Sequence, residues 1–304
     1  MSPSSDENST RDDDNRDGVV AAVRDYVAGL PEKDGLGTCA AEGQAIATIV
    51  APLGLPRRIL AAVYAYPLYR DGFINDKALK NKELEGISRF VLGLKQLDQF
   101  SLPEHWQPGE ALAVQQSEAL RKMLLAVVSD VRLVLVRIAD QLHRLRQAKE
   151  APLELRQALA LESREIYAPL ANRLGVWQLK WELEDLAFRY LEPDTYSEIA
   201  RTLKEKRTER VGFIDEFQRV LYKELAAENI KAEISGRPKH IYSIFRKMQR
   251  KDRGIESLYD IRAVRLLVET VGDCYAALGI VHNLWSYIPG EFDDYIANPK
   301  DNDY

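Results

Sequence analysis

The sequence predicts an α+β protein in which a long all-helical part precedes a smaller part that mixes strands with helices. Through most of the chain up to Leu191, apolar residues recur three or four positions apart, the spacing of helices with one buried face. The first alternating apolar and polar run, typical of a strand, is Ile230–Ile234, and Tyr259–Val268 is a second run of strand length. We therefore expect a small sheet only near the end.

The helical part should begin after a polar tail. Residues 1–17 are rich in Ser, Asp, Asn and Arg, so they bury too little apolar surface to offset their ordering entropy and should be disordered. Residues 94–109 include Pro103 and Pro108 and predict a loop or lid. Asp130 is a good residue to start a helix inside the longest apolar pattern. Helices are expected around 45–51, 59–64, 120–145, 154–174 and 179–191.

A basic stretch follows the first strand. The alternating run stops at Gly236, and helical spacing resumes after Pro238, so we expect a strand, a tight basic loop and a helix. Arg237 and Lys239 then precede a helix N-terminus, whose free N–H groups and dipole favour an anion. Such a stretch suits a polyphosphate, and the alternative is a solvated basic helix after a turn.

An acidic residue opens the second strand. Asp260 stands beside the basic loop in this reading, and hard cations take carboxylate and phosphate oxygens together. We therefore expect Asp260 to be a ligand of Mg²⁺.

Composition narrows the class of protein. The chain has 304 residues, 29% of them charged, and a formal net charge of −5, which disfavours a general nucleic-acid coat. Its two cysteines lie far apart, which excludes a disulfide framework and indicates a reducing compartment. No apolar run reaches membrane-spanning length, and the first residues are unlike a signal peptide. We expect a cytoplasmic protein without a membrane partner.

Four motifs occur in order in the last part of the chain, and together they are more specific than any one of them. They are Ser235–Met248, Tyr259–Val268, Asp273–Tyr275 and Phe292–Lys300. Here the sequence resembles the RelA/SpoT family of guanosine penta- and tetraphosphate, or (p)ppGpp, synthetases and hydrolases. The resemblance implies an HD-type hydrolase domain over residues 18–195 and a nucleotidyltransferase-like synthetase domain over 196–304, incomplete at its C-terminus.

The resemblance also implies a reaction and its residues. ATP donates pyrophosphate to the 3′-hydroxyl of GTP or GDP in the stringent response, with Mg²⁺ as cofactor. Arg237 and Lys239 match the phosphate-binding residues, and Asp260 matches the Mg²⁺ ligand. Further candidates are Lys247 and Arg265 for ATP, each with a surface charge as the alternative, and Asn298, Lys300, Asn302 and the guanine-stacking Tyr304 for the acceptor. Asp303 replaces a Gly of the family and puts acceptor binding in question.

In the helical half, the resemblance implies a metal held by two His and two Asp, and most of these residues are missing. Ala65-Tyr66 stands where His-Asp is expected, Tyr69-Arg70 replaces an acidic pair, and Glu42–Gln44 lacks the upstream His. Only Asp140 remains, with a weak metal shared with His143 as the less favoured alternative. Arg70 would also repel a divalent cation. We expect a pseudo-hydrolase.

A second departure agrees with this expectation. Glu291, Asp293 and Asp294 form an acidic motif where bifunctional relatives carry a basic one, and the acidic form is typical of the synthesis-only RelA branch. The alternative is a solvated acidic turn.

The family continues past the residue matched by Tyr304 to a strand with a catalytic Glu, and long members sense uncharged tRNA on the ribosome through a later half. The 304 residues include neither this strand nor the later half. We therefore expect little synthesis from this chain alone. Two function classes stay open: a RelA-type GTP pyrophosphokinase segment, and a catalytically dead nucleotide-binding or regulatory fragment. An active HD hydrolase is disfavoured.

Overall fold

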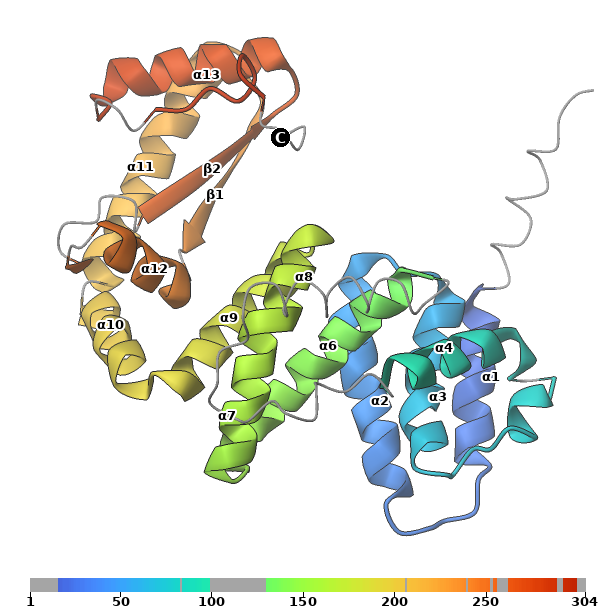
Figure 1. The fold of residues 1–304 in the computed structure, drawn as a ribbon. Coiled ribbons are helices and arrows are strands. Elements are labelled where there is room, and N and C mark those ends of the chain that lie inside the picture. Colours follow the sequence, from blue (N-terminus) through green and yellow to red (C-terminus); the bar gives the residue numbers. More distant parts are fainter. Residues whose placement is uncertain are drawn as a thin grey trace, which may run out of the picture. The chain divides into compact units, whose positions relative to one another are not determined.

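The computed structural model describes residues 16–82, 84–98, 130–205, 207–238, 240–251, 254–255, 262–288 and 292–299. The chain divides into two compact units, Met1–Pro193 and Asp194–Tyr304 (Figure 1). The first unit is helical throughout its described residues, and the second contains a small sheet, as the predicted α+β class requires.

The helices of the first unit follow the expected order. They are α1 (Arg16–Ala28), α2 (Leu36–Val50), α3 (Arg57–Arg70), α4 (Ser88–Asp98), α6 (Arg132–Gln147), α7 (Leu153–Glu162), α8 (Ala168–Arg173) and α9 (Trp177–Leu191). Short 3₁₀ turns lie at Ala51–Leu53, Ala78–Lys80, Glu85–Ile87 and Ala148–Glu150, and a π-helical turn, Ser163–Tyr167, joins α7 to α8.

Helix α3 lies at the centre of this unit, because small residues let its neighbours come close. Ala61, Ala62 and Ala65 are fully buried. On α2, a Cβ at Gly43 would lie 2.7 Å from the carbonyl oxygen of Tyr64, so only glycine fits where the two helices cross. This close crossing fixes the end of α3 beside α2.

Local signals set several helix boundaries. Gly54 adopts a left-handed conformation with φ 67° after the turn at Pro52, and Pro56 precedes α3, so the break between the two apolar helices is confirmed. The predicted helix start at Asp130 is one residue early, since Val131 is the N-cap of α6, although Oδ1 of Asp130 accepts a hydrogen bond from the backbone N–H of Arg132 at 3.0 Å.

Two sequence-based expectations are wrong in part. Arg16 and Asp17 belong to α1 and not to the disordered tail. Residues 94–98 belong to α4, because Leu94 and Leu97 are buried in the core and tie the helix to it. The rest of the expected loop lies outside the described residues.

The second unit contains α10 (Pro193–Glu205), α11 (Arg207–Ala227), β1 (Ala232–Pro238), α12 (Ile241–Lys251), β2 (Arg262–Val268) and α13 (Val271–Leu284). The strands β1 and β2 pair antiparallel, from Ala232 opposite Val268 to Pro238 opposite Arg262. One face of this pair, with Ile234 and Leu266, packs on a core formed with Leu221 of α11 and Ala277 of α13.

The expected basic loop is largely strand. Residues 235–238 continue β1 instead of leaving it, because each finds a partner on β2, with Gly236 opposite Val264. Pro238 is tolerated because β1 is an edge strand of the described two-stranded sheet. The helix predicted after it, α12, is confirmed.

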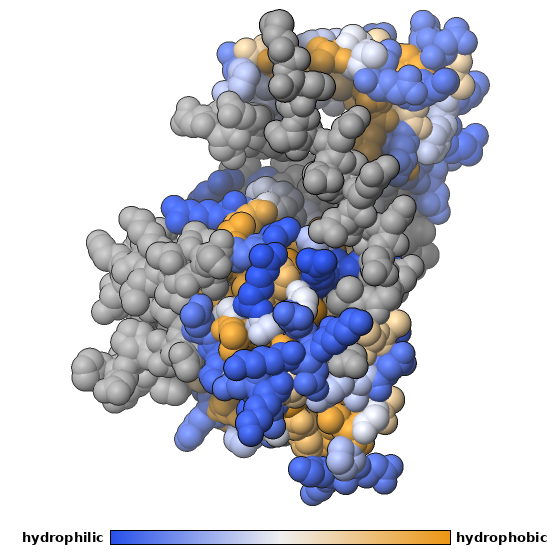
Figure 2. Space-filling model, turned by 90° about the vertical axis from the view of Figure 1, so that its right-hand side faces the viewer, coloured by the Kyte–Doolittle hydropathy of each residue, from blue (hydrophilic) through white to orange (hydrophobic). Residues whose placement is uncertain are grey.

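The face of the protein drawn in Figure 2 is mostly polar. Figure 2 shows one face, where hydrophilic residues cover much of the coloured surface between smaller hydrophobic patches. Within the described part of the chain, no helix is both long and apolar enough to cross a membrane.

Candidate functional site

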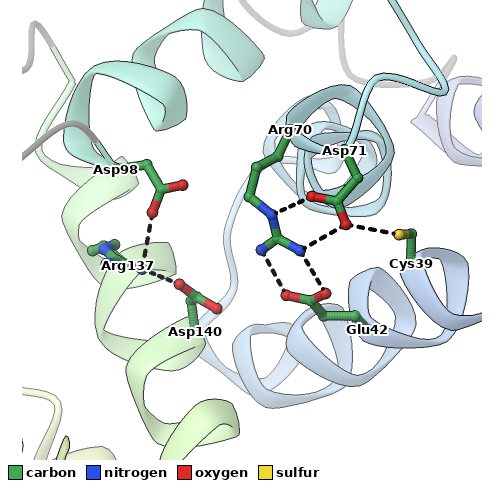
Figure 3. A network of polar contacts seen from close by, with 7 residues as sticks. All are labelled: Cys39, Glu42, Arg70, Asp71, Asp98, Arg137 and Asp140. Carbon is green, nitrogen blue, oxygen red and sulfur yellow. Dashed lines mark hydrogen bonds and ion pairs between the residues drawn. The ribbon is translucent and has the colours of Figure 1, made fainter. Parts of the chain in front are cut away.

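The first candidate site lies in the helical unit, where the resemblance places a metal. Arg70, at the end of α3, donates from Nη1 and Nη2 to the two carboxylate oxygens of Glu42 on α2, at 2.9 Å each (Figure 3). Its Nε donates to Oδ1 of Asp71 at 2.8 Å. A guanidinium thus joins two carboxylates in this region.

Cys39 completes this network. Its thiol donates to Oδ2 of Asp71 at 3.0 Å. Burial, helped by the hydrogen bond to Asp71, raises the pKa of Cys39 to about 11, whereas the hydrogen bond from Arg70 lowers the pKa of Asp71. The thiol is therefore protonated near neutral pH, which is unfavourable for a nucleophile or a metal ligand.

Asp140 pairs with a cation of its own helix. The buried Arg137, three residues earlier on α6, donates to Asp140 and lies 3.4 Å from Oδ1 of Asp98 (Figure 3). Burial raises the pKa of Asp140 against the opposing charge of Arg137. Among the described residues, no group of three or more His, Cys, Asp or Glu side chains is arranged to hold a metal ion.

A pocket of about 390 Å³ lies beside these networks. Tyr66, Tyr69 and Arg70 line it, at positions where the resemblance expects acids, together with Lys95 and Asp98. The hydroxyl of Tyr69 donates to Asp76 at 2.8 Å and accepts from Lys95 at 3.1 Å. Burial, with a hydrogen bond to Asp98, raises the pKa of Tyr66, so this phenol stays neutral.

Sequence reasoning missed Arg137 and Asp98, although one signal was present. Arg137 and Asp140 are three residues apart, so they share one face of a helix and can pair. The contacts of Arg70 with Glu42 and of Asp71 with Cys39 join different helices, and only the folded structure brings these residues together.

The second candidate site is the open face of the β1–β2 pair. Arg265 lies opposite Ser235, and position 237 lies opposite Ala263. Residues two apart on a strand share a face, so positions 237 and 265 belong to the same side of the sheet. That side is opposite the one packed on the core, and Arg265 is exposed on it. Two predicted phosphate-binding positions are therefore brought together.

The acidic motif is described only in part. Asp293 is exposed, whereas Asp294 is half-buried and accepts hydrogen bonds from the N–H groups of Ile296 and Ala297. The N–H of Asn298 donates to the carbonyl oxygen of Asp294 at 3.0 Å. Lys247 lies on α12. The predicted site residues Lys239, Asp260, Glu291, Lys300 and Tyr304 lie outside the described residues.

The chain thus consists of a helical unit with charged pairs where the resemblance places a metal, and a small α+β unit that contains β1 and β2. The family model for the HD domain matches residues 21–177, and the model described as "Region found in RelA / SpoT proteins" matches residues 236–304. The chain therefore belongs to the HD-domain family, with the RelA/SpoT region that marks it as a RelA/SpoT relative.

Curated relatives agree with both matches. A GTP pyrophosphokinase of Photobacterium angustum is 45% identical over 262 residues, covering 86% of this chain and 35% of the relative. One of Escherichia coli K12 is 42% identical with the same coverage. A probable guanosine-3′,5′-bis(diphosphate) 3′-pyrophosphohydrolase of Synechocystis is 39% identical over 264 residues, covering 86% of this chain and 33% of that protein. The chain thus spans about a third of the length of these relatives.

Proposed function

We propose that this chain is part of a RelA-type GTP pyrophosphokinase, which transfers pyrophosphate from ATP to the 3′-hydroxyl of GTP or GDP and lacks hydrolase activity. One observation carries the proposal. The RelA/SpoT region starts on β1, and position 237 of β1 shares the open face of the sheet with position 265 of β2. The GTP pyrophosphokinases of P. angustum and E. coli support the same chemistry.

The proposed nucleotide site combines basic residues for ATP with polar and aromatic residues for the acceptor. Arg237, Lys239, Lys247 and Arg265 bind the phosphates of ATP in this proposal, and Asn298, Lys300 and Tyr304 bind the acceptor. Phosphoryl transfer depends mainly on positioning and on neutralising phosphate charge, so cationic side chains on one open face suit it.

Magnesium is the proposed cofactor. Carboxylate oxygens are the ligands that Mg²⁺ prefers, and the exposed carboxylate of Asp293 has the required chemistry. We assign Asp260 as the Mg²⁺ ligand, and the acidic motif of Glu291, Asp293 and Asp294 as the source of any further carboxylate. When bound, the ion would neutralise charge on the transferred group.

The Synechocystis relative raises hydrolysis as a competing function. Against it stands Arg70, whose guanidinium pairs with Glu42 and Asp71 in the region where the resemblance places the metal. The paired state of Asp140 points the same way. We therefore assign no phosphohydrolase step to the helical unit.

The cellular setting follows from the same proposal. A RelA-type enzyme acts in the stringent response in the cytoplasm, and its longer relatives respond to uncharged tRNA on the ribosome. These partners are expected of the protein that carries this chain.

A transfer assay with β,γ-labelled ATP, GTP and Mg²⁺ tests the proposal, with calorimetric titration of a non-hydrolysable ATP analogue beside it. The proposal expects labelled guanosine pentaphosphate from the natural protein and binding that depends on Arg265. Binding without product would favour the second candidate, a catalytically inert nucleotide-binding module. Neither binding nor product would contradict both.

A further inference from the structure

Two residues on one side of α13 contact the acidic segment Phe292–Asp294. Tyr275 and His282 are seven residues apart, about two helical turns, so both side chains leave the same side of the helix. The Tyr275 hydroxyl donates to Oδ2 of Asp294 at 3.2 Å. The His282 ring meets Phe292 edge-on, with ring centroids 5.9 Å apart. The segment therefore runs back along α13, against the direction of the helix (Figure 1).

Asp294 is fixed from its other side as well. Its Oδ1 accepts from the N–H groups of Ile296 at 2.9 Å and Ala297 at 2.8 Å. These backbone hydrogen bonds, with that from Tyr275, lower the pKa of Asp294 and keep it ionised. The carboxylate thus joins the turn that follows it to α13, and each of its oxygens accepts a hydrogen bond within the protein.

Asp293 stands between the two anchored residues. It is exposed, and no hydrogen bond or ion pair to another described residue engages its carboxylate. The contacts of its two neighbours hold the backbone at Asp293 and so set the side of the segment from which its side chain leaves. Of the two aspartates, Asp293 is therefore the one whose carboxylate is available to bind a ligand.

We infer that Tyr275 and His282 are positioning residues for the acidic segment: by holding Asp294 and Phe292 on α13, they set the direction in which Asp293 meets the metal-bound polyphosphate of a nucleotide. The consequence for nucleotides rests on the proposed function. The anchoring itself does not, because it rests only on contacts within the second unit.

The test uses Tyr275→Phe, which removes one hydroxyl from an exposed ring, with Tyr287→Phe as the control. Tyr287 is 63% exposed, and its ring centroid lies 5.6 Å from that of His282. The control substitution also keeps the ring and loses only a hydroxyl. Amide hydrogen exchange at Ile296 and Ala297 reports the anchoring. It should accelerate about 2- to 10-fold in Tyr275→Phe, as expected for the loss of one hydrogen bond, and stay unchanged in the control.

The second readout is the affinity for a non-hydrolysable ATP analogue with Mg²⁺. Tyr275→Phe and His282→Ala should weaken it, whereas His282→Phe, which keeps a ring against Phe292, should restore it. Unchanged exchange in Tyr275→Phe would overturn the anchoring, and faster exchange with parental affinity would overturn the positioning role. A natural protein that binds the analogue but transfers nothing would contradict the proposed function alone. A parent that binds no analogue would overturn the role of Asp293 as well.

Discussion

Arg70 and Glu42, 28 residues apart in the sequence, join the end of α3 to α2 through two parallel hydrogen bonds of 2.9 Å. Paired guanidinium and carboxylate groups in this geometry are among the stronger hydrogen-bonded contacts in proteins. The pair lies where the resemblance places the metal of an HD hydrolase, so the positive charge in this region is the guanidinium of Arg70.

Breaking this pair should destabilise the helical unit modestly. The Arg70 side chain is 34% exposed and that of Glu42 19%, so solvent screens part of the interaction. A double-mutant cycle with Arg70→Met and Glu42→Gln should give a coupling on the order of 1 kcal/mol in urea unfolding. The Arg146–Glu182 pair, at 43% and 40% exposure, is the control and should couple more weakly. Equal coupling in the two cycles would contradict a special role for Arg70.

Asp140 should give the helical unit a pH dependence opposite to that of an ordinary paired carboxylate. Burial raises its pKa in the folded state, so the folded protein holds the proton more tightly than the unfolded chain does. The contribution of Asp140 to stability therefore falls as pH rises above the usual pKa of about 3.9. Glu162, also raised by burial, acts in the same direction.

The measurement is the unfolding free energy of Asp140→Asn relative to the parent between about pH 4 and pH 7. The variant should gain stability relative to the parent as pH rises, because it lacks the titrating group. A difference that moves the other way would show that Arg137 lowers the pKa of Asp140 below its usual value.

The sequence predicted the helices better than it predicted the ends of β1 and α4. Helical periodicity is local, so Leu135, Ile138, Leu142 and Leu145 indicated α6 without reference to the rest of the fold. Strand ends depend on pairing with a distant segment, and residues 235–238 stay in β1 because β2 pairs with them despite the Gly and the Pro. Local turn signals alone could not indicate this.

The candidate sites divide in the same way. Missing metal ligands at Ala65 and Tyr66 could be read directly from the sequence. The Arg70–Glu42 pair could not, because it needs the close crossing of α2 and α3 at Gly43. Arg237 and Arg265 were predicted separately, and only the register of the sheet shows that their positions share one face.

Gly43→Ala should therefore destabilise the helical unit. The added Cβ would lie 2.7 Å from the backbone oxygen of Tyr64, which cannot rotate away, so the cost should be about 1–3 kcal/mol. Gly37→Ala, on the same helix, is the matched control, because no atom lies within 4 Å of its added Cβ. There, alanine should be neutral or stabilise the helix by less than the roughly 0.5–1 kcal/mol of a helix interior, because Gly37 is in the first turn of α2. Thermal unfolding distinguishes the two, and a tolerated Gly43→Ala would contradict the close crossing.

Loss of a basic residue at the start of the RelA/SpoT region should weaken ATP binding. Arg237→Ala and Lys239→Ala each remove a proposed charge-assisted contact to phosphate, on the order of 1.5–3 kcal/mol. Arg219→Ala on α11 is the control, since Arg219 is exposed and pairs with Glu216. Calorimetry with a non-hydrolysable ATP analogue gives the three affinities. If both Arg237→Ala and Lys239→Ala bind like the control, the basic stretch is only a solvated surface.

Release of pyrophosphate from guanosine tetraphosphate, measured with Mn²⁺ and with EDTA, tests the loss of HD chemistry most directly. Arg70, Tyr66 and Ala65 stand where metal ligands or acids are expected, so the parent should release none. Restoring His and Asp through Ala65→His and Tyr66→Asp should not rescue release, because Arg70 still holds Glu42. Release by the parent that EDTA abolishes would show a working metal site and contradict the synthesis-only proposal.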